Sequence, residues 1–252
     1  AGRGPGGPGP AAAGREVAAA WNTWGMRVIV VRHHAEDSAG FIADAFGAFG
    51  AEFTGHLFPD DGALPPPGGF GHVIVLGATY AVYDLDPARA WIADELAWLR
   101  RCDEAGTAVL GICFGAQALA TAFGGQVERA ARPEIGWRMI DPADPGLIPP
   151  GPWLQFHQDR CLPPPGAALL ARNDTGVQAF GIGRHLAVQF HPEVDGAQLK
   201  SWLNPAAREQ VLAAGLDPEQ FLAETAAREP AARDRASLLV ASALALARGQ
   251  RG

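Results

Sequence analysis

The segment Ala108–Gln117 reads AVLGICFGAQ, and this stretch decides the fold. Its first five residues form a short apolar run typical of a buried strand, and the residues after Cys113 predict a helix. A strand that turns directly into a helix needs small residues at the turn, and Gly111 and Gly115 supply them. The turn brings the sulfur of Cys113 next to the unpaired N–H groups and positive dipole end of the helix. This arrangement favours the nucleophilic thiolate, although a buried cysteine at a glycine-lined turn gives the same pattern.

A second segment, Val188–Glu193 (VQFHPE), supplies a base and a carboxylate. His191 ends an apolar strand-like run, and residues two apart in an extended chain point the same way, so Glu193 lies on the same side as His191. Pro192 stiffens the link between them. The carboxylate can fix the orientation of the imidazole while the other ring nitrogen faces the thiol of Cys113. Taken alone, the His-Pro-Glu segment fits a surface histidine beside a solvated glutamate better. Its place after a buried strand, combined with the turn at Cys113, favours the catalytic interpretation.

On either side of these segments, apolar strand-like runs alternate with stretches in which apolar residues recur at helical spacing. Strands are predicted at 27–31, 73–76 and 108–112, and helices at about 38–49, 87–99 and 116–122. This order predicts an α/β fold with a mostly parallel central sheet flanked by helices. Between residues 126 and 194 the strand-like runs become short and are broken by Pro and Gly.

Three parts of the chain differ in composition. Residues 1–25 are rich in Gly, Pro and Ala and predict a disordered extension before Met26. Residues 26–195 form the predicted domain. Residues 196–252 predict a helical extension packed on that domain, with helices beginning at Asn204-Pro205 and Asp217-Pro218.

Bulk properties exclude several classes of protein. The net charge of −7 disfavours nucleic acid and anionic membrane as partners. No apolar run approaches the ~20 residues of a membrane span. The three cysteines lack metal-type spacing and suit a reducing compartment. We therefore predict a cytoplasmic protein without a metal site or cofactor.

The motifs together resemble those of class I glutamine amidotransferases. The matching segments are GICFGAQ at 111–117, VQFHPE at 188–193 and LGATYAVYD at 76–84, and the resemblance covers about residues 26–195. Stand-alone, GMP-synthase-like members are the more detailed likeness, because they share a segment similar to PEIGW at 133–137 and a helical tail. The resemblance implies a flavodoxin-like fold.

The resemblance also implies a catalytic sequence. Cys113 would attack the side-chain amide of glutamine, forming a γ-glutamyl thioester and releasing ammonia. His191 would act as base and then acid, and Glu193 would orient it. The backbone N–H of Phe114 and one from the Gly77-Ala78 turn would hold the oxyanion.

Substrate contacts are implied at two further places. Gln117 resembles a glutamine that helps to hold the substrate, and the segment Phe156-His157 falls where relatives grip the amino-acid end. Ala78-Thr79 replaces the usual Gly-Pro, so Ala78 would be strained if that turn needs a positive φ.

The remaining polar residues are given structural roles. We expect His33 and His34 to be structural and Glu134 to form a surface salt bridge. Cys102 and Cys161 are expected to be incidental.

Three functions remain open for such a site. The chain contains neither a P-loop nor a pyrophosphatase loop, so the first is a glutaminase that passes ammonia to a separate synthetase subunit. The second is a partner-free hydrolase of γ-glutamyl amides or peptides. The third is a non-catalytic regulatory protein, which the intact set Cys113, His191 and Glu193 disfavours. The first is our prediction.

Overall fold

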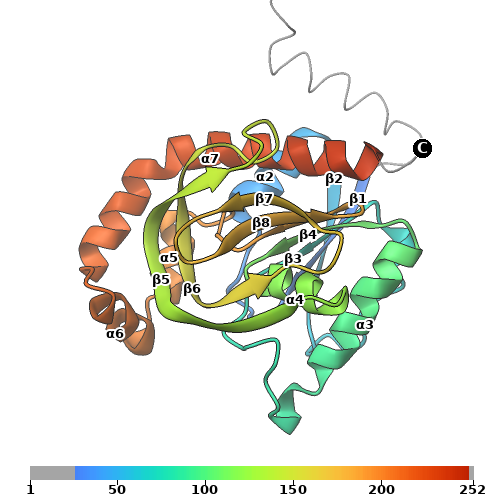
Figure 1. Ribbon diagram of the computed structural model, residues 1–252, viewed down its shortest axis with the longest axis horizontal. Coiled ribbons are helices and arrows are strands. Elements are labelled where there is room, and N and C mark those ends of the chain that lie inside the picture. The colour runs from blue at the N-terminus through green and yellow to red at the C-terminus, as the bar shows by residue number, and fades with distance from the viewer. Residues whose placement is uncertain (1–25, 250–252) are drawn as a thin grey trace, which may run out of the picture.

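Strand β4 (Ala108–Ile112) lies near the middle of a nine-stranded sheet in the computed structural model, which describes residues 26–249 (Figure 1). The strand order is β2-β1-β3-β4-β9-β8-β6-β5-β7. The other strands are β1 (Met26–Arg32), β2 (Ala51–Leu57), β3 (His72–Val75), β5 (Gln126–Pro142), β6 (Gly151–Leu162), β7 (Ala168–Arg172), β8 (Val177–Ile182) and β9 (His185–Val188). The predicted extension at residues 1–25 lies outside the described residues.

Helices surround this sheet. They are α2 (Gly40–Ala48), α3 (Trp91–Glu104), α4 (Phe114–Ala122), α5 (Gly196–Trp202), α6 (Pro205–Ala213) and α7 (Pro218–Gly249), with short 3₁₀ turns η1 (Pro67–Gly69) and η2 (Pro87–Arg89). Asn204 and Asp217 cap α6 and α7 with their side-chain oxygens, so both predicted helix starts are confirmed.

One half of the sheet is parallel. Strand β1 pairs with β2 and β3, and β4 pairs with β3 and β9, all in parallel. Helices α2 and α3 provide the crossovers that parallel neighbours require. Ile112 of β4 lies opposite Val188 of β9, so the segments that begin with Cys113 and Gln189 leave the sheet at the same edge.

The other half is antiparallel and closes on itself. Strand β5 pairs with β6 and β7. Strand β8 also pairs with β6 and with β7, so these four strands form a ring. Strand β8 also pairs antiparallel with β9. The sheet thus has four parallel and five antiparallel pairings, and the prediction of a mostly parallel, flavodoxin-like sheet is wrong. The physical reason is short connections such as Gly183-Arg184 between β8 and β9, which can join only antiparallel neighbours.

Apolar side chains cover both faces of the parallel half. Because side chains alternate along a strand, Val28 and Ile74 pack with α2 and α7, whereas Ile29 and Val73 pack with α3 and α4. A third apolar cluster joins β5 and β6 to α5, α6 and the start of α7. The C-terminal helices therefore share cores with the sheet.

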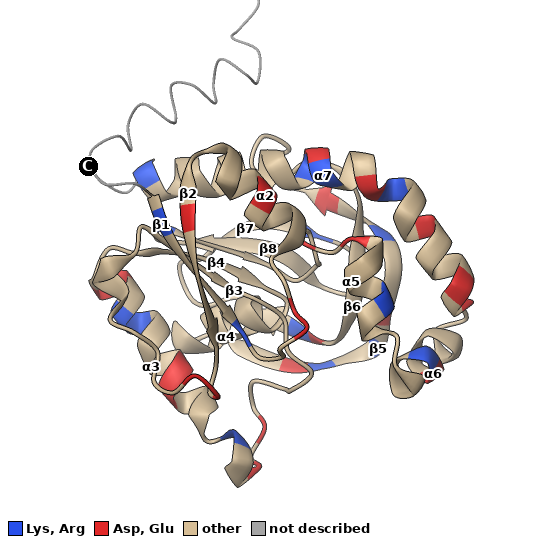
Figure 2. Cartoon of the chain, turned by 180° about the vertical axis from the view of Figure 1, so that it is seen from behind, with Lys and Arg blue, Asp and Glu red and all other residues tan. Residues whose placement is uncertain are grey.

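Helix α7 runs along the outside of the molecule for 32 residues. Figure 2 shows acidic and basic positions interspersed along it, while residues such as Leu239 and Leu244 are buried against the sheet and α2. Within residues 26–249, no helix combines the length and apolar character needed to cross a bilayer.

Candidate active site

Cys113 joins β4 to α4 in a strained backbone conformation, with φ 51° and ψ −104°. Among the described residues it is the only non-glycine residue with a positive φ. Such a conformation costs ~1–3 kcal/mol and persists only where the surroundings impose it. A Cβ on Gly115 would lie 2.3 Å from the carbonyl oxygen of Val75, and one on Gly111 would lie 2.5 Å from that of Gly115. The predicted need for small residues at both positions is confirmed.

His191 lies between the cysteine and a carboxylate. Its Nδ1 atom is 2.8 Å from Oε1 of Glu193, and both its ring and Cβ of Cys113 lie against Gly77. Burial acts to lower the pKa of His191, but the charges of Glu193 and Cys113 and the hydrogen bond to Glu193 raise that pKa well above its ordinary value. The ring of Trp202 in α5 packs edge-on against His191 at 4.9 Å between centroids. This arrangement suits an imidazole that takes a proton from the sulfur.

Glu193 is held by backbone contacts as well as by His191. Its carbonyl oxygen accepts a hydrogen bond of 3.1 Å from the N–H of Phe41 at the start of α2. A Cβ on Gly40 would lie 2.0 Å from the same oxygen, so only glycine fits there. Oε2 of Glu193 is buried and has no hydrogen-bond partner within residues 26–249.

Gly77 lies against both His191 and Cys113. A Cβ added to it would lie 3.1 Å from Cε1 of His191 and 3.7 Å from Cβ of Cys113. The next residue, Ala78, does not have a positive φ, so the strain considered for it is absent. Neither the N–H of Ala78 nor that of Phe114 donates to another group in the described part of the chain. Both N–H groups are therefore without a hydrogen-bond partner among residues 26–249.

Gln189 links the predicted substrate-binding glutamine to the cysteine. Its Nε2 donates to Sγ of Cys113 at 3.6 Å, and its Oε1 accepts from Nε2 of Gln117 at 3.3 Å. The thiol of Cys161 donates to the same oxygen at 3.5 Å. Cys161, expected to be incidental, thus lies next to the site, and burial raises its pKa.

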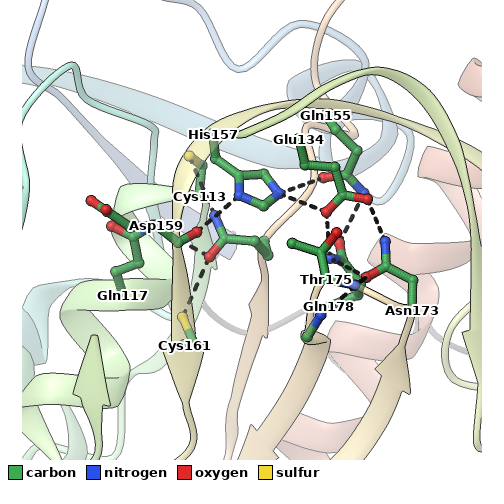
Figure 3. A network of polar contacts seen from close by, with 12 residues as sticks. Cys113, Gln117, Glu134, Gln155, His157, Asp159, Cys161, Asn173, Thr175 and Gln178 are labelled. Carbon is green, nitrogen blue, oxygen red and sulfur yellow. Dashed lines mark hydrogen bonds and ion pairs between the residues drawn. The ribbon is translucent and has the colours of Figure 1, made fainter. Parts of the chain in front are cut away.

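A buried polar network forms around His157 (Figure 3). Its Nδ1 lies 2.9 Å from the carbonyl oxygen of Asp159, and its Nε2 lies 3.0 Å from Oε1 of Gln155 and 3.2 Å from Oε2 of Glu134. Both ring nitrogens are therefore engaged within the chain. Gln178 and Asn173 donate to Glu134. The prediction that Glu134 forms a surface salt bridge is wrong, because its side chain is 5% exposed.

Phe156, the other predicted substrate contact, packs beside the ring that contacts His191. The ring of Phe156 lies 6.2 Å from that of Trp202, which in turn contacts His191. Tyr83, in the loop after β3, donates to Oδ1 of Asp159 at 2.9 Å and so joins that loop to β6.

Sequence reasoning missed the glutamines of these networks. Gln155, Gln178 and Gln189 each interrupt an otherwise apolar strand run, at LQF, VQA and VQF. A polar side chain in a buried strand must find partners, so these interruptions were the available signal.

Two other features bear on ligand binding. Among residues 26–249, no group of three or more His, Cys, Asp or Glu side chains is placed to hold a metal ion. A cavity of about 600 Å³ lies between β5 and α6, and its lining includes Arg132, Glu134, Gln158 and Gln210 but not Cys113.

The chain is similar to known proteins both in sequence and in structure. The family model "Glutamine amidotransferase class-I" matches residues 67–204. A GMP synthase [glutamine-hydrolyzing] from Thermus thermophilus is 35% identical over 181 residues, which cover 67% of this chain and 34% of that protein. Gamma-glutamyl peptidase 5 from Arabidopsis thaliana is 33% identical over 150 residues, which cover 54% of this chain and 57% of that protein.

Among solved structures, a glutamine amidotransferase from Thermotoga maritima has the same fold, with a TM-score of 0.77 at 23% identity. The match covers 88% of this chain and 98% of that one. This chain spans about a third of the length of the GMP synthase and just over half that of the peptidase.

Proposed function

Because this chain belongs to the class-I glutamine amidotransferase family, we propose that it hydrolyses the side-chain amide of glutamine through a thioester on Cys113 and releases ammonia. The observation that carries the proposal is that His191, paired with Glu193, and Cys113 lie side by side against Gly77. This neighbourhood supports the roles of nucleophile for Cys113, base for His191 and orienting group for Glu193.

The chemistry has two halves. In the first, His191 takes the thiol proton of Cys113, and the thiolate attacks the amide carbon. The N–H groups of Phe114 and Ala78 stabilise the oxyanion that forms, as preorganised donors do. His191 then protonates the leaving nitrogen, so ammonia departs and the γ-glutamyl thioester remains. In the second half, His191 takes a proton from water, which attacks the thioester and releases glutamate and the thiol.

Other residues of the site hold the substrate and the nucleophile in place. We assign Gln117 to the substrate and Gln189 to the orientation of both Gln117 and the sulfur, because its amide bridges them. His157 fixes the backbone of its own strand, since both its ring nitrogens already have partners. We assign the backbone beside Phe156 and His157, which pairs with β5 on one side, to the amino-acid end of glutamine.

We propose that the ammonia passes to a synthetase on a separate chain. The GMP synthase relative supports this assignment by its name, which includes glutamine hydrolysis. The peptidase relative supports a second candidate, a hydrolase that cleaves γ-glutamyl amides or peptides without a partner. Both use the same thioester.

The experiment is a substrate screen with matched cysteine variants. The full chain is incubated with glutamine and with γ-glutamyl amines, and the release of ammonia or amine is measured. We expect Cys113→Ala to abolish turnover and Cys102→Ala, a change at a buried cysteine of α3, to preserve it. Turnover of glutamine that rises with an added synthetase supports the first candidate, and faster cleavage of γ-glutamyl amines alone supports the second. Full activity of folded Cys113→Ala protein would contradict both.

A further inference from the structure

A second buried histidine–carboxylate pair lies next to the proposed oxyanion donors. His33, the first residue after β1, has its Nε2 atom 3.0 Å from Oε2 of Glu95 in α3, and neither side chain is exposed. Its Nδ1 atom lies 3.4 Å from the carbonyl oxygen of Gly77. The ring also packs edge-on against Phe114, with 4.8 Å between centroids. The His33–Glu95 pair therefore contacts both segments that carry the two unused N–H groups.

The partners of His33 favour its protonated form. Both ring nitrogens face oxygen acceptors, and only the doubly protonated imidazolium can donate to two acceptors at once. Burial acts to lower the pKa of His33, but the charge of Glu95 and the hydrogen bonds to Glu95 and Gly77 raise it above its ordinary value. The contacts and the direction of the pKa shift both favour the imidazolium form of His33 beside Glu95. Oε1 of Glu95 is buried without a hydrogen-bond partner in the described chain.

We propose that the His33–Glu95 pair positions and polarises the Gly77-Ala78 peptide, so that the N–H of Ala78 is an aimed and strengthened oxyanion donor. The inference rests on the proposed function. In a trans peptide the C=O and N–H groups point in opposite directions, so a carbonyl held toward His33 directs the N–H of Ala78 away from His33. A hydrogen bond accepted by the carbonyl polarises the peptide and strengthens its N–H as a donor.

The position of Gly77 fits this role. A Cβ added to Gly77 would face His191 and Cys113, so the peptide that follows lies at the edge of the reacting centre. The 3.4 Å contact between His33 and Gly77 is long for a hydrogen bond, and we expect it to shorten when negative charge develops on the substrate oxygen. His33 acts here through the peptide and does not touch the substrate.

The test uses two variants that keep the packing. Glu95→Gln removes the carboxylate charge and leaves the shape, and the neutral imidazole can still donate to one partner. The double variant His33→Phe with Glu95→Leu keeps the ring stack and removes the donor to Gly77; replacing both members of a buried pair by apolar groups usually preserves the fold. Removing an oxyanion donor outright costs roughly 10²–10³ in kcat, so we expect losses of about tenfold for Glu95→Gln and about 100-fold for the double variant.

Two further readouts distinguish positioning from a general structural effect. KM for glutamine should stay within about twofold, because the oxyanion exists only in the transition state. Alkylation of Cys113 by iodoacetamide forms no oxyanion, so its rate should equal that of the unmodified protein. The matched control is Asp103→Asn, which removes the carboxylate 3.2 Å from His185 at the far end of β9 and should leave kcat unchanged.

The outcomes separate the two proposals. Wild-type kcat in the folded variants would overturn the inference, and so would a rise in KM alone or a parallel loss of alkylation and turnover. If Glu95→Gln fails to fold, the double variant decides. A wild-type protein that turns over no glutamine or γ-glutamyl amine would overturn the proposed function itself, and this inference with it.

Discussion

The N–H of Cys113 donates a hydrogen bond of 2.9 Å to the carbonyl oxygen of Val188. This bond continues the parallel pairing of β4 with β9 by one residue beyond the strands. It places the cysteine beside the segment that reaches His191 three residues later. Two motifs that are far apart in the sequence therefore meet because of the register of one strand pair.

The strain at Cys113 predicts that two inactive variants differ in stability. Both Cys113→Gly and Cys113→Ala should be inactive. Glycine adopts a positive φ without steric cost, whereas alanine keeps the strain, so Cys113→Gly should be more stable than Cys113→Ala by about 1 kcal/mol. Thermal unfolding of the two variants measures the difference, and an alanine variant of equal or greater stability would contradict it.

The line from Cys113 through His191 to Glu193 predicts unequal losses. His191→Ala removes the group that transfers the proton and should lower kcat by roughly 10²–10⁴. Glu193→Gln keeps an acceptor oxygen within reach of Nδ1 and removes only the charge, so its loss should be smaller. Steady-state kinetics on folded variants provide the measurement, and equal losses would refute the ranking.

The raised pKa of His191 predicts a dependence of stability on pH. A histidine whose pKa is higher in the folded than in the unfolded state contributes stability that is complete below its unfolded value, about 6.5. That contribution is lost as the pH rises through the folded pKa. The free energy of unfolding should therefore fall less steeply above pH 6.5 in His191→Gln than in the wild type. Denaturant titrations at several pH values test this, with the slope due to His33 present in both proteins.

Two neighbouring leucines of α7 test how far the C-terminal helix stabilises the fold. Leu239 is fully buried against the sheet, whereas Leu238 is 52% exposed. Leu239→Ala should cost ~2–5 kcal/mol of stability. Leu238→Ala should cost less than about 0.5 kcal/mol, because surface changes usually do. Chemical denaturation gives both values, and similar losses would show that α7 adds little to the core.

The sequence predicted the parallel strands that are buried and the turn at Cys113. Their apolar runs and paired glycines are local signals, which need no knowledge of the rest of the chain. It gave no sign of β2, because most of that strand is an exposed edge without apolar alternation. The ring of β5 to β8 was not predicted, because Pro and Gly turns mark where strands end but not which strands pair.

The polar networks depend on register and so were harder to predict. Glu134 meets His157 because these residues lie opposite one another in β5 and β6, after an irregularity between Arg129 and Glu134. No local sequence pattern predicts this shift in the pairing of β5 with β6. His33 and Glu95 are likewise 62 residues apart and meet only through the packing of α3 beside β1.

The closed ring of β5 to β8 has a consequence for how this molecule meets others. A strand whose backbone groups are unpaired on one side offers a template on which another chain can extend the sheet. The ring leaves no edge strand at its end of the sheet, and within the described residues β2 forms the remaining edge. Any assembly by strand addition is thereby directed to β2, where Glu52, Thr54 and His56 interrupt the run and discourage indiscriminate aggregation.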